Sequence, residues 1–539
     1  MNAPANALPD PFRDGIAGGW NVIDASTLTV DTTYEADVAI VGTGAGGGTA
    51  AEILSAAGLR VILLEEGPLR TSRDFKMREA VAYPDLYQES AARRTADKAI
   101  GILQGRCVGG GTTVNWTSSF RTPPATLRYW QEAFGLTGFS VDALSPYFAR
   151  MEERLSIAPW EVAPNANNAA LARGAAKLGI EAAVIRRNVK GCWNIGYCGL
   201  GCPTNAKQSM LVTTIAGALG RGATLVSRVR AKAFAFEGDR VARLECVAMD
   251  ARGVYPTSRR ITIRARAYVA AGGAIGSPAL LLRSRTPDPH GLVGKRTFLH
   301  PTVVSVARMP ERVDAFAGAP QVIYSDHFLD QAPPGGPIGY KLEAPPVHPV
   351  LGAITLPNHG PVHAEWMREL PRLQVVIALL RDGFNPESPG GSVALRDDGQ
   401  PVLDYPLTPY LFEGMRRAFV SMAQIQFAAG ATRVMPIQAN GAAFTNVADA
   451  QRAIAGFALS PRITPVVSAH VMGGCPLGED PRRAVVDVTG RHHQLGNLYV
   501  LDGSLFPTSI GANPQLSIYG IVAKLADGLA ASLANPRRV

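Results

Sequence analysis

A glycine-rich turn near the start of the chain has the composition and spacing that bind the phosphates of a dinucleotide. It reads Gly42-Thr-Gly44-Ala45-Gly46-Gly47, which fits G-x-G-x-x-G. In such a turn the first glycine permits a tight bend, the second lets the backbone approach a pyrophosphate, and the third lets helix and strand pack closely. Glu65, which ends the next apolar run, is of a type that binds ribose hydroxyls, and Glu66 is a second candidate. The turn predicts NAD or FAD and does not distinguish them.

Three cysteines in one glycine-rich loop form a second pattern with chemical meaning. Cys192, Cys198 and Cys202 have the spacing C-x5-C-x3-C and are followed by Pro203. Clustered thiolates suit an iron–sulfur cluster or zinc, whereas buried thiols or one disulfide are the plainer interpretation. Six cysteines in 539 residues are few for a secreted protein that is held together by disulfides. The spacing leaves a metal centre and unligated thiols both open.

The glycine turn requires a strand before it and a helix after it, and the apolar pattern supplies both. Strands are predicted at 37–41 and 59–64 with a helix at 49–57 between them, which is one unit of a parallel, doubly wound sheet. Residues 300–455 are richer in proline and show weaker periodicity, which favours a second domain built on an antiparallel sheet. Further strands are predicted at 223–234, 241–249, 261–269 and 498–501, and further helices at 141–155 and 514–533.

Composition and patterning exclude some partners and locations. The formal charge is 53 − 44 = +9, but the basic residues are scattered and no basic run is interleaved with aromatic residues, so we expect no nucleic-acid partner. The N-terminus shows no signal-peptide pattern. The longest apolar run, 268–282, is too short and too interrupted to span a bilayer. We expect a cytoplasmic protein without a transmembrane segment, while export with a partner and peripheral membrane contact stay open.

Four separated segments resemble the glucose–methanol–choline (GMC) oxidoreductase family, in the family's order. They are the Gly42 turn with Leu64-Glu-Glu-Gly67, the segment 105–115, the segment 273–284, and the C-terminal motifs around His470, Asp502 and Asn513. The resemblance spans residues 35–535, and the cysteine loop looks closest to the bacterial long-chain fatty-alcohol and sterol oxidase branch. It implies an α/β fold, in which a Rossmann-like FAD-binding domain carries a second, α+β substrate domain built on an antiparallel sheet.

The resemblance implies a discontinuous division of the chain. Residues 1–34 are expected to form a polar N-terminal arm. The FAD-binding domain is expected to comprise 35–130, 205–300 and 456–539, and the substrate domain that caps the flavin to comprise 131–204 and 301–455.

Roles for individual residues follow from the same resemblance. His470 looks like the base that takes the alcohol proton while hydride leaves for flavin N5, and histidine suits this role because its pKa lies near working pH. Asn513 resembles the second member of the pair, which hydrogen-bonds and orients the substrate oxygen. His300 is expected to be structural. Val114 stands where some relatives carry a histidine that bonds the flavin, so the resemblance predicts noncovalent FAD.

The remaining cofactor contacts are implied by position in these motifs. Asp502 and Gly503 are expected near the ribityl chain or pyrophosphate, and the backbone of Val229 near the adenine. The full set of residues expected to contact FAD is Gly42, Gly44, Ala45, Gly46, Gly47, Glu65, Glu66, Gly109, Gly110, Gly111, Thr112, Asn115, Val229, Asp502, Gly503, Asn513 and Pro514.

The expected reaction is oxidation of a primary or secondary, apolar alcohol to an aldehyde or ketone, with electrons passed to dioxygen or to a quinone- or cytochrome-type acceptor. Two alternatives stay open. One is a sugar or polyol dehydrogenase with an iron–sulfur relay at the three cysteines, whose spacing also resembles that branch of the family. The other is a hydroxynitrile lyase, in which the flavin is structural and there is no net redox change.

Overall fold

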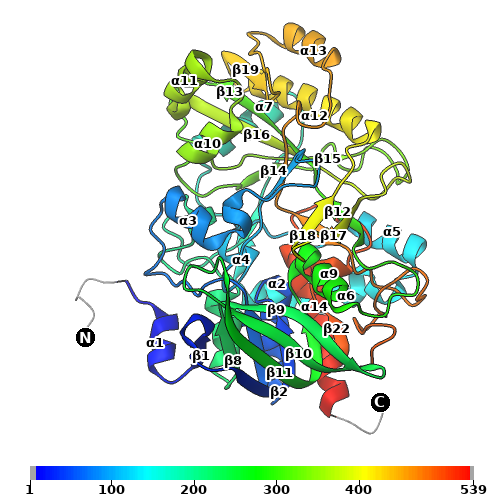
Figure 1. Cartoon of the computed structure of the whole chain (residues 1–539). Helices are drawn as coiled ribbons and strands as arrows, with labels where there is room; N and C mark the ends of the chain where they lie inside the picture. Colours follow the sequence, from blue (N-terminus) through cyan, green and yellow to red (C-terminus); the bar gives the residue numbers. More distant parts are fainter. Residues whose placement is uncertain (1–7, 535–539) are drawn as a thin grey trace.

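A mostly parallel sheet in the lower half of Figure 1 supports the glycine turn. The computed structural model describes residues 8–534, and eight strands form this first sheet in the order β1–β8–β3–β2–β11–β10–β9, with β22 also paired to β11. β9 and β10 extend it in antiparallel fashion, while the other pairs are parallel. The strands are β1 (Asn21–Asp24), β2 (Thr32–Val41), β3 (Val61–Glu65), β8 (Thr224–Ser227), β9 (Val229–Glu237), β10 (Arg240–Met249), β11 (Pro256–Ala270) and β22 (Leu498–Val500).

The parallel direction of these strands decides where a ligand can bind. All five residues of β3 are buried, which is the continuous apolar run of a parallel strand that is covered on both faces. Helix α2 (Ala45–Ala56) begins directly after Gly44 and makes the crossover from β2 to β3. The carboxyl ends of β2, β3, β11 and β22 therefore meet at one edge of the sheet, where sheets of this kind bind their ligands.

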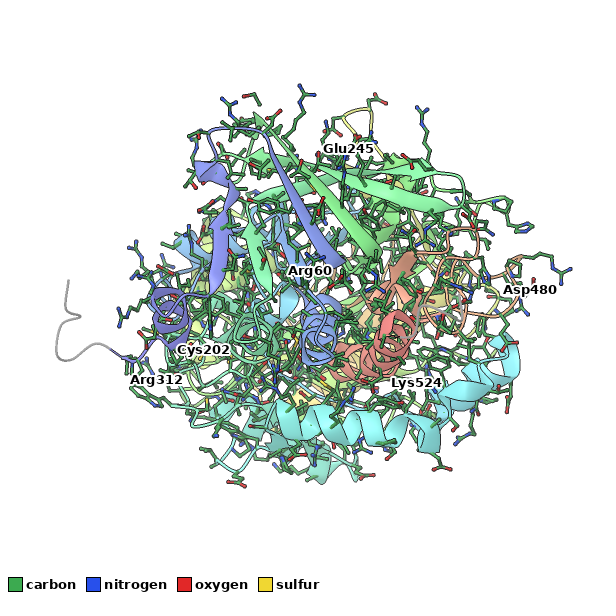
Figure 2. The ribbon with its side chains drawn as sticks, turned by 90° about the horizontal axis from the view of Figure 1, so that it is seen from below. Arg60, Cys202, Glu245, Arg312, Asp480 and Lys524 are labelled. Carbon is green, nitrogen blue, oxygen red and sulfur yellow. The ribbon has the colours of Figure 1, made fainter. Side chains whose placement is uncertain are left out.

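Helix α14 (Gln515–Ala534) packs beside α2 on one face of this sheet, and Figure 2 shows the two helices side by side, with Lys524 marking α14. Among the described helices, α14 is the one that is long and apolar enough to cross a membrane. However, 56% of its apolar window is buried inside the protein, and Leu516 and Tyr519 belong to the core around the first sheet. Helix α14 is therefore a helix of the protein core.

A second sheet lies above the first in Figure 1 and is largely antiparallel, in the order β4–β20–β13–β16–β15–β14–β6, with β19 paired to β13. Helix α12 (Pro409–Ala428) covers one face, where Ser305 donates to Gln426 and Tyr340 bonds Ser421. The expected α+β second domain is confirmed. The strands are β4 (Ile100–Ile102), β6 (Ala183–Val184), β13 (Thr302–Arg308), β14 (Ile323–Ser325), β15 (Tyr340–Glu343), β16 (Leu373–Leu380), β19 (Arg433–Pro436) and β20 (Val466–Ser468).

A third, four-stranded sheet joins the two halves in the order β18–β17–β12–β21. Its strands are β12 (Lys295–Leu299), β17 (Gly391–Leu395), β18 (Pro401–Asp404) and β21 (Val471–Gly473). The chain leaves the second sheet at the end of β20 and enters the third at the start of β21, so His470 lies where the chain passes between them. His300 follows β12 and precedes β13 in the same way.

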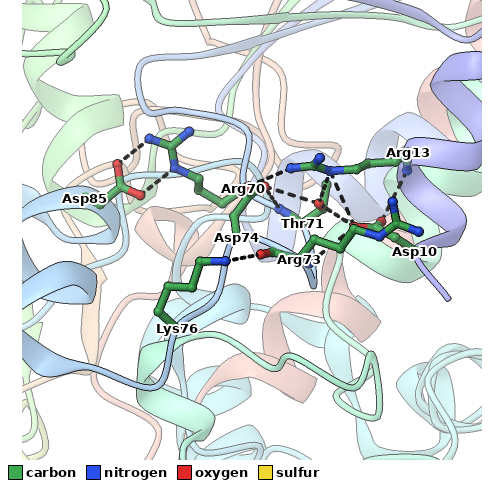
Figure 3. A network of polar contacts seen from close by, with 8 residues as sticks. All are labelled: Asp10, Arg13, Arg70, Thr71, Arg73, Asp74, Lys76 and Asp85. Carbon is green, nitrogen blue, oxygen red and sulfur yellow. Dashed lines mark hydrogen bonds and ion pairs between the residues drawn. The ribbon is translucent and has the colours of Figure 1, made fainter. Parts of the chain in front are cut away.

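The N-terminal segment is more than the polar arm expected for residues 1–34, of which 1–7 lie outside the described residues. Helix α1 (Pro11–Ala17) is followed by β1, which adds an edge strand to the first sheet beside β8. A polar network holds α1 against the loop after β3 (Figure 3): Thr71 donates to Asp10 at 2.6 Å, and Arg13 donates to Asp74 at 2.6 Å. The sheet therefore begins before the expected boundary at residue 35.

Two other segments differ from their expected extent. Helix α6 (Val141–Arg154) packs on α14, with Phe148 over Gly520, so it belongs to the first core although it lies within the expected cap segment 131–204. The strand predicted at 223–234 is broken at Arg228, whose φ of +53° separates β8 from β9. The remaining elements are α3 (Glu79–Leu86), α4 (Gly111–Val114), α5 (Pro124–Phe134), β5 (Ile157–Pro159), α7 (Ala166–Lys177), β7 (Arg186–Asn188), α8 (Ala216–Leu219), α9 (Gly273–Ser284), α10 (Pro349–Thr355), α11 (Gly360–Arg368) and α13 (Val447–Ala455).

Two helical glycines offer a matched test of the packing between helices. A Cβ on Gly174 of α7 would lie 2.1 Å from the carbonyl oxygen of Ile425 in α12, whereas a Cβ on Gly528 of α14 would meet nothing within 4 Å. We expect Gly174→Ala to lower the free energy of unfolding by about 1–3 kcal/mol through overpacking. Gly528→Ala should raise it by about 0.5–1 kcal/mol, because alanine restricts the unfolded chain. Denaturant titration measures both, and equal effects would contradict the described contact.

Candidate active site

The first glycine turn is packed against neighbouring backbone at three of its four glycines. A Cβ on Gly42, whose φ is +104°, would lie 2.3 Å from the Ala271 carbonyl oxygen. A Cβ on Gly46 would lie 1.9 Å from the Leu501 oxygen, and one on Gly47 would lie 1.9 Å from the Gly42 oxygen. At Gly44 the nearest atom is 4.0 Å away, so open space remains beside the uncapped N-terminus of α2. A pyrophosphate fits there, against free N–H groups and the positive end of the helix dipole.

The second glycine segment, residues 105–115, lies directly beside the first turn. The hydroxyl of Thr43 donates to Glu65 at 2.6 Å and accepts the N–H of Gly109 at 3.0 Å. Gly110 has a φ of +52°, and a Cβ there would lie 2.8 Å from the Cα of Gly44. Only glycine permits this approach. Gly111 then begins α4, and the hydroxyl of Thr112 closes the turn on the Gly109 carbonyl at 2.6 Å.

The two glutamates after β3 have different surroundings. Glu65 is buried and accepts the N–H groups of Thr43 and Gly67, and burial raises its pKa. Glu66 lines a cavity of about 90 Å³ with Gly105, Gly272 and Arg230 among its other walls. Burial raises the pKa of Glu66, but the guanidinium groups of Arg230 and Arg106 outweigh burial and lower it overall. The ionised Glu66 therefore faces a cavity, whereas Glu65 stabilises the first glycine turn through its hydrogen bonds.

The carboxylate of Asp502 links the segment 273–284 to the C-terminal motifs. Its carboxylate accepts the N–H of Gly273 at 2.7 Å and the hydroxyl of Ser277 at 2.6 Å, both in α9, and the N–H of Ser504 at 2.8 Å. Burial raises the pKa of Asp502. Gly503 follows in the same turn, with the side chain of Ile518 beyond it. The carboxylate holds the start of α9 against the end of β22, at the edge where the glycine turns meet.

The far end of the second glycine segment is anchored by Asn115. Its side chain donates to Gln515 in the first turn of α14 at 2.7 Å, and its carbonyl accepts the buried ammonium of Lys207 at 2.7 Å. Pro514 immediately precedes α14 and accepts the N–H of Ile518. Val229 is buried at the start of β9, close to Ser227, the strand partner of Glu65.

These residues fit FAD. The open space at Gly44, the two touching glycine turns and the cavity beside Glu66 follow one edge of the sheet, which suits an extended dinucleotide. Val114 is buried, and its carbonyl accepts the hydroxyl of Tyr87. Its aliphatic side chain has no nucleophile that could bond a flavin.

The cysteine loop lies against the other side of this segment. Cys192, Cys198 and Cys202 are free, and the described residues contain no group of three or more His, Cys, Asp or Glu side chains arranged to hold a metal ion. Arg187, fully buried, donates to the Cys198 sulfur at 3.7 Å, and Lys207 donates to the Cys198 carbonyl at 2.6 Å. Burial lowers the pKa of Lys207 to about 8. Two buried cations thus connect the loop with the segment at 113–117.

His470 and Asn513 are brought near each other by His300. The Nδ1 atoms of His300 and His470 are 2.9 Å apart, with their rings at 89°. On its other side, His300 Nε2 accepts the N–H of Gly511 at 3.1 Å, two residues before Asn513. His300 was expected to be structural, and it is the residue that joins the two candidate segments.

The hydrogen bonds of His300 fix where the protons of the pair sit. Burial lowers the pKa of His470 to about 4 and that of His300 well below its usual range, so both rings are neutral at working pH. Because His300 accepts at Nε2, its one proton lies on Nδ1 and is donated to His470 Nδ1. His470 then carries its proton on Nε2. In this arrangement His470 presents an Nε2–H group as a donor, and its expected role as the base that takes the alcohol proton stays a prediction.

Two charged residues of β15 that the sequence patterns did not single out complete the site. The amide nitrogen of Asn513 donates to Glu343 at 3.3 Å, and Lys341, two residues earlier, lies on the same face of the strand. The second carboxylate oxygen of Glu343 and the amide oxygen of Asn513 are buried without a hydrogen-bond partner in the described structure. Alternation along an otherwise apolar strand was the only available signal for them.

Two aromatic rings contact Lys341 and also line a cavity. The ammonium of Lys341 lies 3.8 Å from the ring centre of Phe120 and 4.0 Å from that of Tyr324, and pairs with Asp326 at 2.7 Å. The same two rings line a cavity of about 310 Å³, whose other walls include Arg121 and Val184. Phe120 and Tyr324 therefore contact the Lys341 ammonium and also line the cavity.

Comparisons with known proteins agree with this geometry. The GMC oxidoreductase family profile matches residues 83–302 and 386–521, which is more than half of the chain. A GMC-type oxidoreductase of Mycobacterium tuberculosis is 30% identical, covering 93% of this chain and 77% of its own. A long-chain-alcohol oxidase of Arabidopsis thaliana is 28% identical, covering 92% of this chain and 67% of its own. The chain belongs to the GMC oxidoreductase family of FAD-dependent enzymes, and the expected family is confirmed.

Solved structures support the fold. Formate oxidase from Aspergillus oryzae superposes with a TM-score of 0.71 at 16% identity, covering 94% of this chain and 100% of its own. Pyridoxine 4-oxidase from Mesorbium loti superposes with a TM-score of 0.68 at 20% identity, covering 91% and 98%. At these identities the likeness shows the fold alone, which is the expected Rossmann-like FAD-binding domain with its second domain.

Val114 makes the attachment of the flavin testable. With an aliphatic side chain at this position, we expect acid precipitation of the purified yellow protein to release all flavin absorbance into the supernatant. Free FAD carried through the same precipitation serves as the control for recovery. Flavin that stays with the precipitated chain would contradict noncovalent binding.

Proposed function

We propose that the protein oxidises a primary or secondary, apolar alcohol to an aldehyde or ketone, using noncovalent FAD. The observation that carries this proposal is a chain of contacts: His470 bonds His300, His300 accepts the N–H of Gly511, and Asn513, two residues further on, donates to the buried Glu343. Such a cluster can hydrogen-bond a hydroxyl oxygen and transfer its proton. When FAD is bound, it supplies the hydride acceptor. Dioxygen or a quinone- or cytochrome-type acceptor is the proposed destination of the electrons.

The proposed cofactor contacts divide along the edge of the first sheet. Gly44 and the start of α2 would hold the pyrophosphate, Glu66 with Glu65 behind it would face the ribose, and Val229 would lie near the adenine. Gly109–Thr112 and Asn115 would support the flavin ring. Asp502 would act by holding α9 in place, because its carboxylate already accepts hydrogen bonds from Gly273, Ser277 and Ser504.

The face of the second sheet that carries Glu343 supports an apolar substrate. Cross-strand pairing places Val304, Ile377 and Glu343 in one row and Leu379 beside Lys341 in the next. Val304, Ile377 and Leu379 keep 6–8% of their surface exposed, whereas Val303, Ala378 and Leu380 on the α12 face are fully buried. The polar cluster is therefore flanked by buried aliphatic side chains, against which an alkyl group would pack. The long-chain-alcohol oxidases among the relatives act on substrates of this kind by their names.

Within this site, each side chain has a distinct task. The Nε2–H of His470 would donate to the alcohol oxygen and stabilise the negative charge that develops there as hydride leaves the carbinol carbon. The amide of Asn513 would orient the same oxygen. The aromatic rings of Phe120 and Tyr324 would separate the reacting atoms from water in the surface cavity.

Anaerobic mixing with alcohols tests the reaction directly. We expect a long-chain primary alcohol to bleach the visible absorbance of the bound flavin, because hydride transfer reduces it. A hydrocarbon of equal chain length without the hydroxyl is the control and should leave the absorbance unchanged. Retained colour with every alcohol, together with cleavage of a cyanohydrin, would instead establish the lyase alternative.

His470→Ala removes the donor to the substrate oxygen and leaves the glycine turns intact. We expect the rate of anaerobic flavin reduction to fall roughly 10²–10³-fold, as for loss of one preorganised donor. The FAD content per chain should match that of the unaltered protein. A near-normal rate at full FAD content would contradict a role for His470 in the reaction.

A further inference from the structure

The hydrogen bond between Gly511 and His300 joins two segments that are far apart in the chain. One is the histidine segment, residues 298–301, and the other is the glycine loop, residues 508–511. A third segment, residues 380–383 at the end of β16, contacts both of them. Within it, the N–H of Leu380 donates to the carbonyl of Pro301, the residue after the histidine, at 3.1 Å.

Two further residues of the third segment pack closely against the same two segments. A Cβ on Gly511 would lie 2.7 Å from the Cδ of Arg381. A Cβ on Gly383, whose φ is +95°, would lie 3.0 Å from the ring of Phe298 and 3.0 Å from the Cβ of Thr508. The histidine segment and the glycine loop therefore both rest on residues 380–383.

Asp382 is hydrogen-bonded toward both segments at once. Its carboxylate accepts the hydroxyl proton of Tyr405, and the same hydroxyl accepts the N–H of Leu299 in the histidine segment at 3.3 Å. Its backbone carbonyl accepts the hydroxyl of Ser509 in the glycine loop at 2.6 Å. One residue thus connects to the partners on either side of the bond between Gly511 and the histidine.

The pair of Asp382 and Tyr405 is fully buried, which makes it costly to keep. Burial raises the pKa of Asp382, and hydrogen bonds from Ser388, Tyr405 and the N–H of Gly383 oppose that rise. A buried polar group costs free energy unless donors and acceptors satisfy it. Apolar side chains would fill the same space without this cost, but they would not make directional contacts. The polar pair therefore fixes the relative position of the segments that it joins.

We propose that Asp382 and Tyr405 are positioning residues for His300. Through the histidine segment and the glycine loop they keep the N–H of Gly511 on His300 Nε2. That contact in turn keeps the proton of His470 on Nε2. Without it, either ring nitrogen of neutral His300 can carry the proton, and His470 is no longer restricted to one tautomer. The proton positions belong to the protein itself, whereas their use in alcohol oxidation rests on the proposed function.

Tyr405→Phe tests the assignment, because it removes only the hydroxyl that joins Leu299 to Asp382. In the FAD-loaded variant we expect nitrogen NMR of labelled histidines to show His470 as a mixture of its two neutral tautomers. The unaltered protein should show the proton on Nε2 alone. The rate of anaerobic flavin reduction by a long-chain primary alcohol should fall roughly 10–10²-fold, at unchanged FAD content per chain, because the donor is misplaced.

Tyr268→Phe is the matched control. Tyr268 is also buried, and its hydroxyl likewise accepts a backbone N–H, from Ala265 at 2.9 Å, and donates to the carbonyl of Ala242 at 3.1 Å. These contacts lie in the first sheet, so the histidine signals and the reduction rate should match those of the unaltered protein. An equal tautomer shift in both variants would mean that loss of any buried hydroxyl suffices, and the assignment would be overturned.

Ser509→Ala releases the glycine loop from the other side and deletes a single hydroxyl, so it decides the matter even if Tyr405→Phe does not fold. We expect the same mixture of His470 tautomers. Because both substitutions act through one contact, the double variant should reduce its flavin about as fast as the slower single variant. Rate losses that multiply in the double variant would contradict a shared contact.

The tautomer measurement separates this inference from the proposed function. If His470 keeps its proton on Nε2 alone in Tyr405→Phe or in Ser509→Ala, whatever the stability of these variants, the positioning roles are overturned. If no alcohol reduces the flavin of the unaltered protein, the proposed function fails. The histidine spectra still decide the positioning roles in that case, because they are recorded without turnover.

Discussion

The hydrogen bond from the Gly511 N–H to His300 Nε2 sets the positions of the protons on the two histidines of the candidate site. It occupies the only position at which neutral His300 can accept, so His300 must donate from Nδ1, and His470 must receive there and keep its own proton on Nε2. Burial keeps both rings neutral. One backbone N–H, in the loop before α14, therefore sets which ring nitrogen of His470 carries the proton, and we propose that this N–H donates to the substrate oxygen.

The candidate site joins the carboxyl edge of the first sheet to the second sheet, because Asn513, which follows β22, donates to Glu343 of β15. Parallel strands bring the carboxyl ends of β2, β3, β11 and β22 to one edge, where glycines let the turns touch and Asp502 fixes α9. The second sheet turns Lys341 and Glu343 toward this edge and keeps its other face on α12. His300 and His470 both lie where the chain passes between the second and third sheets. The proposed cofactor and substrate positions therefore meet at the junction of the sheets.

The parts of this arrangement that depend on local spacing could be predicted from the sequence. The Gly42 turn, its flanking strand and helix, and the antiparallel second domain are local or periodic signals, and they are confirmed. The contacts of Glu343 and Lys341 could not be predicted, because the partners of a charged residue on an apolar strand come from strands and loops distant in the sequence. The tautomer of His470 likewise depends on His300 and Gly511, residues 170 and 41 positions away in the chain. The strand β1 could not be predicted, because four residues at the edge of a sheet show little apolar pattern.

The central claim is that neutral His470 carries its proton on Nε2, and NMR of the FAD-loaded protein with isotope-labelled histidine nitrogens measures this directly. Comparison with His470→Gln assigns the two signals of this ring. We predict a protonated, pyrrole-type Nε2 and an unprotonated, pyridine-type Nδ1 at neutral pH, with the reverse protonation in His300. A proton on Nδ1 of His470, or a positively charged His470 ring at neutral pH, would contradict the account.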